Sequence, residues 1–530
     1  MATRLTGFSK LVITLGILAI IFFAGRYVMN NTSLGGKLKQ QAQQSQAEEA
    51  ANAGKTDANT SSGPKDPNTL RVQLVTWGGY APGLYFNEGA AANSRSRYFK
   101  DYGIKVDFKV ENDLVNAMNA WMADEYDIIV QTADAFPLYT APNDINAFKP
   151  KAFMQVDWSR GGDAIIVKRG INTANDLKGK KIAVAVPSPA QTLLNSTLEA
   201  AGLKYSDVTV IKTSDNLKAA ELFRSKDVDA AVVWSPDDIL ATKDVPGSKI
   251  LLTTREQSHI IGDIFFAKED VINKKREMFK SFYEGWMKGV AELKNPANTE
   301  KAAKYLAELN GVAVEDAKGM MENVYFSNHG DNLNFFGLNA AYKGQKGQDL
   351  YEKMAKKFVE TGDADKIAPS WRSVINTTAM QDADATLRTA EYSAEKPKVF
   401  TSSPNDRTAP IISSKPISIN FDSGKFTLSE NAKTIIDLQF ADVARTFGNT
   451  KVRIEGNTDN VGGKALNKTL SQKRAQAVAD YLRSQYGMDP NKFVIVGNGP
   501  DKPVSGCESY ADETCKAKNR RTEFQLIAAD

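Results

Sequence analysis

Two charged residues near the C-terminus stand where a carboxylate and a guanidinium can hold one small ligand. Residues Lys451 to Glu455 have the pattern of a strand that runs into a polar, glycine-punctuated loop, and this loop contains Asp459. The spacing of Leu470, Arg474 and Leu482 places them on one side of a predicted helix, with Arg474 one turn into it. A ligand held by both charged side chains would carry an ammonium group and a carboxylate.

A longer motif surrounds this pair. It comprises Thr458-Asp459-x-x-Gly462, Asn467-x-x-Leu470-Ser471-x-x-Arg474-Ala475 and a closing Asn519-Arg520-Arg521. The motif resembles the peptidoglycan-binding domain of the outer membrane protein A family, in which the matching Asp and Arg hold the diaminopimelate of the peptide stem. By this resemblance Asp459 would take the ammonium group and Arg474 the carboxylate, the group that Arg binds in bidentate fashion. The resemblance predicts a site made of Thr458, Asp459, Asn467, Leu470, Ser471, Arg474, Arg520 and Arg521.

Residues 416–530 must supply the elements that position these side chains. The predicted order is β-α-β-α-β-β, an α+β domain with helices on one face of a mixed sheet. Its elements are the strand Ile417–Phe421, the helix Glu430–Phe447, the strand Lys451–Glu455, a helix ending at Gly487, and the strands Phe493–Gly497 and Arg521–Ile527. The first helix is expected to contribute Ile435, Leu438 and Ala441 to a core.

Cys507 and Cys515 are the two cysteines of the chain, and both precede Asn519. In an exported protein, an isolated pair eight positions apart is most simply a disulfide, with two free thiols as the alternative. A metal site would need more ligands than this segment offers, so we predict no metal.

Residues 70–390 show short apolar strands alternating with helices, the pattern of a mostly parallel α/β sheet in two lobes. The segments that carry a family likeness are Ala174-Asn-Asp-Leu177-Lys-Gly179, Pro187-Ser188-Pro189-Ala190-Gln191 and Asp227-Val-Asp229-Ala-Ala-Val-Val-Trp234-Ser-Pro236. They are similar to segments of periplasmic solute-binding proteins of the nitrate, sulfonate and taurine type. This resemblance implies a two-lobed periplasmic-binding-protein fold with a ligand between the lobes.

In such a fold the ligand lies outside the carboxyl ends of the strands. The expected solute-binding residues are Trp77, Gly78, Tyr80, Asp134, Ser188, Gln191, Trp234 and Asp237. Backbone N–H groups at Ser188 to Gln191 favour an anion, whereas Asp134, Asp237 and Asp263 favour a cation or zwitterion. The charge of the solute therefore stays open.

The remaining segments predict an anchor and two linkers. Arg4 and Lys10 precede an apolar run from Leu11 to Gly25, so residues 1–29 are expected to form a cytoplasmic tip and a transmembrane signal anchor, with a cleaved signal peptide as the alternative. Residues 30–69 and 391–415 are polar and rich in turn-forming residues, and we expect both to be linkers. This arrangement predicts a single-pass inner-membrane protein with most of its chain in the periplasm of a Gram-negative cell.

The composition and the absence of catalytic motifs argue against nucleic-acid binding and against enzymatic activity. The net charge of +4 over 530 residues is too small to indicate binding to a polyanion, so no nucleic-acid partner is predicted. The chain has only two His and lacks a phosphate-binding Gly-Lys-Ser/Thr loop or a nucleophile elbow, so neither catalysis nor a cofactor is expected, although some solute-binding relatives make thiamine precursors. The predicted protein binds a small solute and attaches to the diaminopimelate of peptidoglycan, with a possible partner in the inner membrane. The alternative is a structural or motor-associated wall tether whose solute-binding fold only presents a protein surface.

Overall fold

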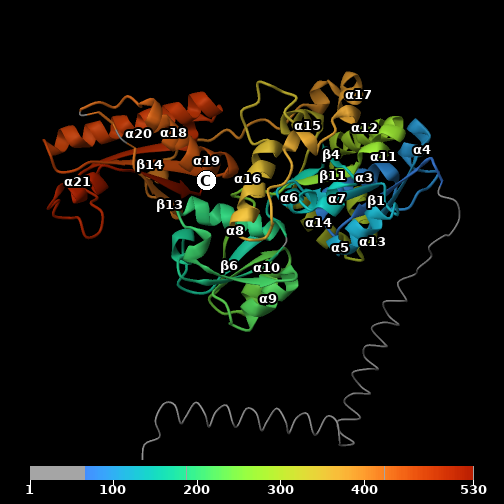
Figure 1. The fold of residues 1–530 in the computed structure, drawn as a ribbon, viewed down its shortest axis with the longest axis horizontal. Helices are drawn as coiled ribbons and strands as arrows, with labels where there is room; N and C mark the ends of the chain where they lie inside the picture. The colour runs from blue at the N-terminus through green and yellow to red at the C-terminus, as the bar shows by residue number, and fades with distance from the viewer. Residues whose placement is uncertain (1–65, 187, 420, 423, 529–530) are drawn as a thin grey trace, which may run out of the picture. The chain divides into compact units, whose positions relative to one another are not determined.

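The computed structural model describes residues 66–528 except 187, 420 and 423, and Figure 1 shows its elements. The signal anchor predicted within residues 1–29 and nearly all of the linker predicted at 30–69 lie outside the described residues. Within the described part, no helix has both the length and the apolar character needed to cross a membrane.

The first lobe is built on a five-stranded sheet in the order β2-β1-β3-β11-β4. Its strands are β1 (Thr69–Leu74), β2 (Lys105–Val110), β3 (Ile128–Thr132), β4 (Pro150–Gln155) and β11 (Asp263–Lys268). Strand β1 pairs in parallel with β2 and β3, while β11 runs antiparallel to β3 and β4. The lobe is therefore parallel at its centre and completed by a strand that returns from the second lobe.

Helices surround this sheet and share one large aromatic core with it. They are α3 (Ala81–Asn87), α4 (Arg97–Tyr102), α5 (Leu114–Met122), α6 (Phe136–Thr140), α7 (Asn143–Asn146), α11 (Glu269–Lys274), α12 (Arg276–Glu292), α13 (Pro296–Asn310), α14 (Val314–Glu322), α15 (His329–Phe335), α16 (Gly347–Glu360) and α17 (Thr378–Leu387). Helix α12 has Trp286 and Phe282 fully buried against the sheet residue Phe265. The late helical stretch of the sequence thus belongs to the core of the first lobe.

The second lobe is a five-stranded sheet in the order β10-β6-β9-β7-β8. Its elements are β6 (Asp163–Val167), β7 (Lys181–Ala185), α8 (Pro189–Ala200), β8 (Thr209–Thr213), α9 (Asn216–Arg224), β9 (Ala230–Trp234), α10 (Asp237–Asp244) and β10 (Lys249–Thr253). Strand β7 is parallel to β8 and β9, and β6 is antiparallel to β9 and β10. Two chain segments join the lobes side by side, since the amide of Ser159 donates to the carbonyl of Ile261 at 2.9 Å. The two-lobed α/β fold predicted from the sequence is confirmed.

The C-terminal domain has a four-stranded sheet in the order β13-β16-β14-β15. Its elements are β13 (Ile411–Ile417), α18 (Glu430–Ile436), a single π turn (Asp437–Ala441), α19 (Asp442–Thr446), β14 (Lys451–Asn457), α20 (Lys464–Tyr486), β15 (Phe493–Gly499), α21 (Glu513–Asn519) and β16 (Thr522–Ile527). Apart from the added α21, this is the predicted β-α-β-α-β-β order. The first strand lies earlier than predicted, because it is Ile411–Ile417 that pairs with β16.

The helical segment 430–446 buries a different stripe from the one we predicted. Ile436 and Phe440 are fully or nearly fully buried, whereas Leu438 is 78% exposed. Leu438 lies two positions from both, which places it on roughly the opposite side of a helix. Its assignment to the core was therefore wrong, while Ala441 is buried as expected.

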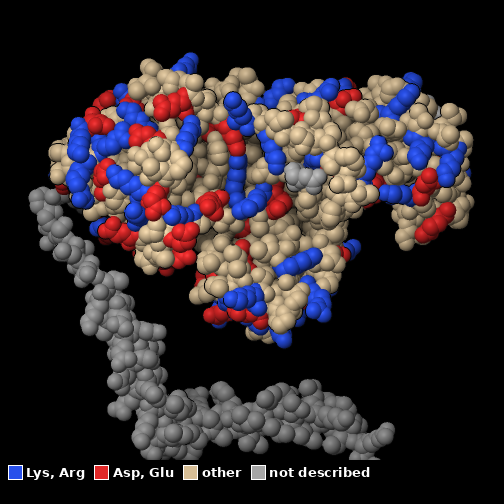
Figure 2. Space-filling view, turned by 180° about the vertical axis from the view of Figure 1, so that it is seen from behind, with Lys and Arg blue, Asp and Glu red and all other residues tan. Residues whose placement is uncertain are grey.

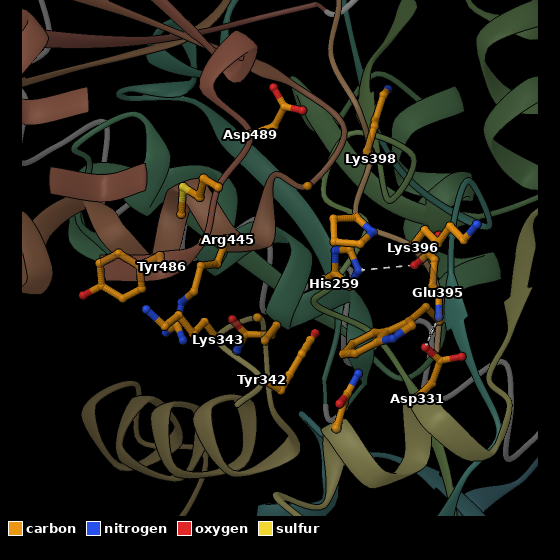
Figure 3. A pocket seen from close by; sticks show the side chains of 18 of the residues that line it. His259, Asp331, Tyr342, Lys343, Glu395, Lys396, Lys398, Arg445, Tyr486 and Asp489 are labelled. Atoms are coloured by element: carbon orange, nitrogen blue, oxygen red, sulfur yellow. Dashed lines mark hydrogen bonds and ion pairs between the residues drawn. The ribbon is translucent and has the colours of Figure 1, made fainter. Parts of the chain in front are cut away.

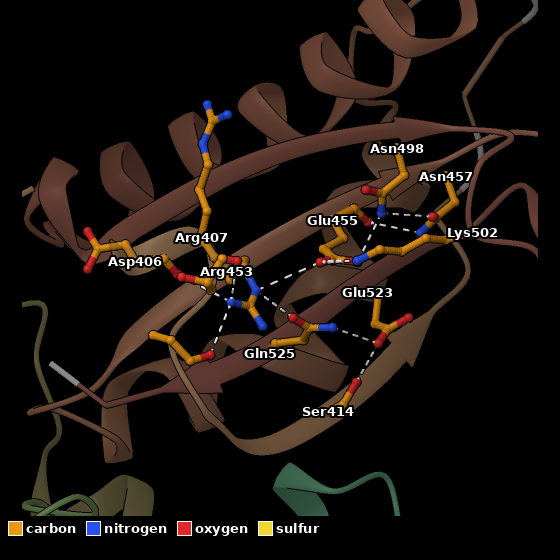
Figure 4. Close-up of polar contacts among 12 residues, drawn as sticks. Asp406, Arg407, Ser414, Arg453, Glu455, Asn457, Asn498, Lys502, Glu523 and Gln525 are labelled. Atoms are coloured by element: carbon orange, nitrogen blue, oxygen red, sulfur yellow. Dashed lines mark hydrogen bonds and ion pairs between the residues drawn. The ribbon is translucent and has the colours of Figure 1, made fainter. Parts of the chain in front are cut away.

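The second face of this sheet is polar yet buried. Strand β14 directs Arg453 and Glu455 to that face, where Arg453 Nε donates to Gln525 Oε1 at 2.6 Å and Lys502 Nζ donates to Glu455 at 2.8 Å (Figure 4). Arg453 also donates to the backbone carbonyl of Arg407 at 2.8 Å. The segment preceding β13, which the sequence predicted as part of a linker at 391–415, therefore contacts this polar face.

Candidate functional site

A pocket of about 470 Å³ opens at the end of the C-terminal sheet. The residues that line it come from four places: the segment after β13, the end of β14 and its following loop, helix α20, and the residues at the start of β16. Its lining is Ile419, Phe421, Gly424, Gly456, Asn457, Thr458, Asp459, Val461, Asn467, Leu470, Arg474, Arg520, Arg521 and Thr522. A volume of this size suits a small polar ligand.

The loop after β14 holds Asp459 in a fixed position. The amide of Thr458 donates to the carbonyl of Gly499 at 2.9 Å, which ties the loop to β15. Asn467 on α20 donates from its side-chain amide to the carbonyl of Val461 at 2.9 Å, and the amide of Val461 donates to Asp459 Oδ1 at 3.1 Å. The other carboxylate oxygen, Oδ2, accepts a 2.7 Å bond from Arg520.

Arg474 faces the same pocket from helix α20. The helix begins at Lys464, so Arg474 lies about three turns into it rather than the one turn we predicted. Its guanidinium lies 4.9 Å from the ring centroid of Phe421, and it donates to the carbonyls of Lys425 and Asp422 at 3.0 and 3.2 Å. Burial lowers the pKa of Arg474, while the carboxylate of Asp459 acts in the opposite direction.

The structure gathers most of the residues predicted for this site. Seven of the eight line the pocket, whereas Ser471 lies beneath it, where its Oγ accepts a 3.0 Å bond from the amide of Gly499. Sequence reasoning missed Phe421, whose ring meets Arg474 from a segment 53 residues earlier in the chain. It also missed that Arg520 pairs with Asp459, because the motif fixes which residues are present but not which of them contact each other.

The residues predicted for the interlobe site are mostly buried and already hydrogen-bonded. The indole N–H of Trp77 donates to Asp157 Oδ2 at 3.0 Å, and the hydroxyl of Tyr80 donates to Asp263 Oδ2 at 2.6 Å. Asp134 of the first lobe accepts a 2.5 Å bond from Thr192 on α8 of the second lobe. The two lobes therefore meet directly at Asp134.

The other predicted residues occupy different environments. Gly78 packs so closely on the carbonyl of Met320 that a Cβ atom would lie 2.3 Å from it. Ser188 caps α8 by accepting from the amide of Ala190, and the Gln191 side chain donates to Asp363. At the far end of β9, Trp234 is 37% exposed.

The predicted Asp237 faces a basic partner, whereas its neighbour points inward. A carboxylate oxygen of Asp237 lies 3.7 Å from Arg224, while Asp238 is only 4% exposed and its Oδ1 has no hydrogen-bond partner among the described residues. Sequence reasoning missed Asp238 because adjacent positions at a helix start give no signal of which side chain faces the core.

Five buried carboxylates lie in and around the interlobe region without a basic partner. They are Asp134, Asp157, Asp163, Asp238 and Asp263, each no more than 7% exposed and none in a salt bridge with a described Lys, Arg or His. Burial raises the pKa of Asp134, Asp163 and Asp263 to about 7, and it raises the pKa of Asp157 as well. Such groups favour either a bound proton or a bound positive charge.

Cys507 and Cys515 form the predicted disulfide. It closes the segment that leads into α21 and Asn519. The side chain of Asn519 donates to the carbonyls of both cysteines, at 3.1 and 2.9 Å, immediately before Arg520. The disulfide therefore stabilises the backbone that positions Arg520, the residue paired with Asp459.

Comparison with known families agrees with both resemblances. Residues 420–520 match the OmpA family, and residues 90–299 match the family described as NMT1/THI5 like. The chain thus joins an OmpA-family domain at its C-terminus to an NMT1/THI5-like domain, as the motifs predicted.

Curated proteins show partial similarity. The chain is 30% identical over 164 residues to outer membrane porin F of Pseudomonas aeruginosa, which is 31% of this chain and 46% of the porin. It is 29% identical over 161 residues to outer membrane protein A of Bordetella avium, covering 30% of this chain and 80% of that protein. A protein of Brucella abortus named as a binding protein is 32% identical over 120 residues, or 22% of this chain and 37% of that protein. The chain therefore spans less than half the length of the first and third of these relatives.

Solved structures similar to the chain include two periplasmic binding proteins. The aliphatic sulphonate binding protein of Escherichia coli has a TM-score of 0.46 at 19% identity, covering 58% of this chain and 98% of its own. The nitrate-binding protein of Synechocystis PCC 6803 has a TM-score of 0.44 at 13% identity, covering 63% of this chain and 92% of its own.

Proposed function

We propose that the protein is a wall-attached solute-binding protein of the cell envelope, without a catalytic role. Its C-terminal domain binds peptidoglycan through the diaminopimelate of the peptide stem. The observation that carries this proposal is the pocket in which Asp459 and Arg474 face one space of about 470 Å³. Asp459 would take the ammonium group of diaminopimelate and Arg474 the carboxylate, both through charge-assisted hydrogen bonds.

The chemistry of the pocket supports these roles. Nε and Nη2 of Arg474 donate to backbone carbonyls, whereas its Nη1 has no hydrogen-bond partner among the described residues. A ligand carboxylate would supply that partner without displacing an existing ion pair. Asp459 sits beside Arg520, so an incoming ammonium group would share the carboxylate with a fixed neighbour.

Co-sedimentation of the protein with purified diaminopimelate-type sacculi tests this proposal. Arg474→Ala and Asp459→Ala should each cost about 2–5 kcal/mol, because each leaves one charge of the ligand unpaired. Arg483→Ala is the matched control, since Arg483 lies on the same helix, is half-exposed and lies 3.7 Å from Asp480. Lysine-type sacculi lack the second carboxylate and should bind more weakly. Undiminished binding by both pocket variants would remove the assignment.

The NMT1/THI5-like domain is proposed to bind a small solute between its lobes. The bond from Thr192 to Asp134 and the contact of Trp77 with Gly162, where a Cβ atom would lie 2.1 Å from the indole, bring the two lobes into direct contact. The five buried carboxylates favour a solute that carries positive charge, because each would otherwise be buried without a counter-ion. We therefore propose a cationic or zwitterionic solute.

We retain the N-terminal anchor as part of the proposal. It rests on the apolar run Leu11 to Gly25 and the basic residues before it. The full-length protein should fractionate with the inner membrane and resist carbonate extraction. Recovery of a soluble form that starts near residue 25 would show cleavage instead.

A further inference from the structure

A second cavity lies where the solute-binding half meets the C-terminal half. It has a volume of about 460 Å³ and shares no lining residue with the pocket around Asp459. Tyr342, Lys343 and Gln345 line it from the first half, and Arg445 and Lys492 line it from the second. Figure 3 shows Tyr342, Lys343 and Arg445 around the same space as His259 and Glu395.

Several buried polar atoms at this cavity lack a partner. Gln345 is 3% exposed, yet both its side-chain oxygen and its side-chain nitrogen are without a hydrogen bond to any described residue. The Nε atoms of Arg160 and Arg445 are likewise unpartnered within the described chain. Buried donors and acceptors are almost always satisfied in native proteins, so these atoms point to a molecule that the cavity receives.

The cavity carries an excess of positive charge. Six basic and three acidic side chains line it, His259 aside. The two arginines are already neutralised: Arg160 makes bonds of 2.5 and 2.6 Å to Glu395, and Arg445 pairs with Asp349 at 3.0 Å. The remaining acids, Asp331 and Asp489, accept hydrogen bonds from nearby backbone amides.

The lysines at the cavity lack such neutralising partners. Lys343 Nζ donates to the carbonyl of Ser484 at 3.1 Å, and Lys492 Nζ donates to the carbonyls of Phe447 and Thr450, each at 2.8 Å. Lys398 Nζ lies 3.4 Å from the carbonyl of Asn449. None of these lysines forms a salt bridge with a described carboxylate. On the face seen in Figure 2, by contrast, basic and acidic side chains are mixed across the surface.

We propose that this cavity binds a small organic anion. Its carboxylate or phosphate group is received by Lys343, Lys396 and Lys398, because the buried Lys492 already donates to three backbone carbonyls, and a neutral polar part pairs with the side-chain amide of Gln345. The volume is within the usual range for small-molecule sites, and Trp158 and Tyr486 supply aromatic walls. Because both halves of the chain supply ligand contacts, the bound anion holds the solute-binding half to the wall-binding half. This site is independent of the function proposed for either half.

Isothermal titration of the full-length protein with citrate, and separately with glycerol 3-phosphate, at constant ionic strength tests the proposal. The two probes distinguish a preference for carboxylate from one for phosphate. At least one should bind, and the paired substitutions Lys343→Gln and Lys396→Gln should weaken binding at least tenfold. The matched control carries Lys243→Gln and Lys356→Gln, which lie outside the lining. Choline, as a cationic probe, should leave the hydrogen exchange of residues 342–345 and 486–492 unchanged.

A second variant separates binding from folding. Gln345→Met removes both unpartnered polar atoms, so it should raise the unfolding midpoint of the ligand-free protein and at the same time abolish probe binding. Hydrogen exchange locates the probe without any substitution. Bound anion should protect residues 342–345 and residues 486–492 together.

Three results would each overturn the proposal. They are the absence of binding by both probes, binding that survives the Lys343→Gln and Lys396→Gln pair, and exchange protection confined to one half of the chain. Protection of residues 456–474 instead would place the anion at Arg474 in the wall-binding pocket.

Discussion

The guanidinium of Arg520 donates a 2.7 Å hydrogen bond to Oδ2 of Asp459, across 61 positions of sequence. Its second Nη donates to Glu513, a more exposed residue on α21. Arg520 therefore fixes the orientation of the carboxylate that is proposed to receive the ligand. A ligand ammonium group would meet a carboxylate that Arg520 already orients.

Arg520→Ala should weaken binding of a soluble diaminopimelate tripeptide by several-fold, and less than Asp459→Ala does. The substitution leaves the carboxylate in place but free to rotate, so binding must order it. Fluorescence anisotropy with a labelled tripeptide measures the affinity of each variant and so shows which substitution costs more. Equal losses for the two variants would indicate that Arg520 contacts the ligand itself.

Cationic solutes should stabilise the NMT1/THI5-like domain, and anionic ones should not. Binding at a hundredfold excess over Kd adds about 2.7 kcal/mol to the free energy of unfolding. A thermal-shift panel of putrescine, choline and arginine, against taurine and nitrate, measures this difference.

Asp157→Asn should abolish the thermal stabilisation by cationic solutes. Asp237→Asn should preserve it, because Asp237 faces Arg224. A shift with taurine alone would contradict the assigned charge. A panel in which nothing binds would favour the alternative of a tether whose fold presents only a protein surface.

The stability of the ligand-free protein should fall as pH rises from about 5 to 8. The pKa of Asp134 and Asp163 is raised to about 7 in the folded state, above the unfolded value, so the folded state holds more protons across this window. Stability therefore decreases with pH and levels off above the folded pKa.

Chemical denaturation at several pH values checks this dependence. Asp134→Asn should make the curve shallower, because the amide cannot ionise while Asp163 keeps its own contribution. The exposed Asp365→Asn serves as the control and should leave the curve unchanged. Stability that rises over this range in the wild-type protein would contradict the prediction.

Reduction of the Cys507–Cys515 disulfide should weaken both folding and wall binding. Opening a loop this short costs about 2–3 kcal/mol of stability. It also frees the carbonyls that accept from Asn519, the residue before Arg520. Sacculus binding of the Cys507→Ser, Cys515→Ser protein should drop modestly. An unchanged affinity would show that Asn519 holds Arg520 without the disulfide.

The local elements were largely predictable from sequence. Strand β14 begins at the predicted Lys451, and α20 ends at Tyr486 with the predicted Gly487 as its C-cap, because apolar periodicity and a glycine after a helix are local signals. The late strand β11 was missed. Its pairing with β3 and β4 depends on a chain that has left the lobe and returned, and periodicity carries no information about such pairing.

The sequence by itself determined the two domain types, the disulfide, and the presence of Asp459 and Arg474 on a strand–loop–helix unit. These follow from residues close together in the chain, where spacing fixes geometry. Only the tertiary structure decided that Arg520 pairs with Asp459 and that Asp238, rather than Asp237, is buried. It also created the cavity at Gln345, whose walls come from separate segments between Gln155 and Lys492. Such contacts depend on how sheets and lobes pack, and packing is set by the whole chain at once rather than by any one stretch of it.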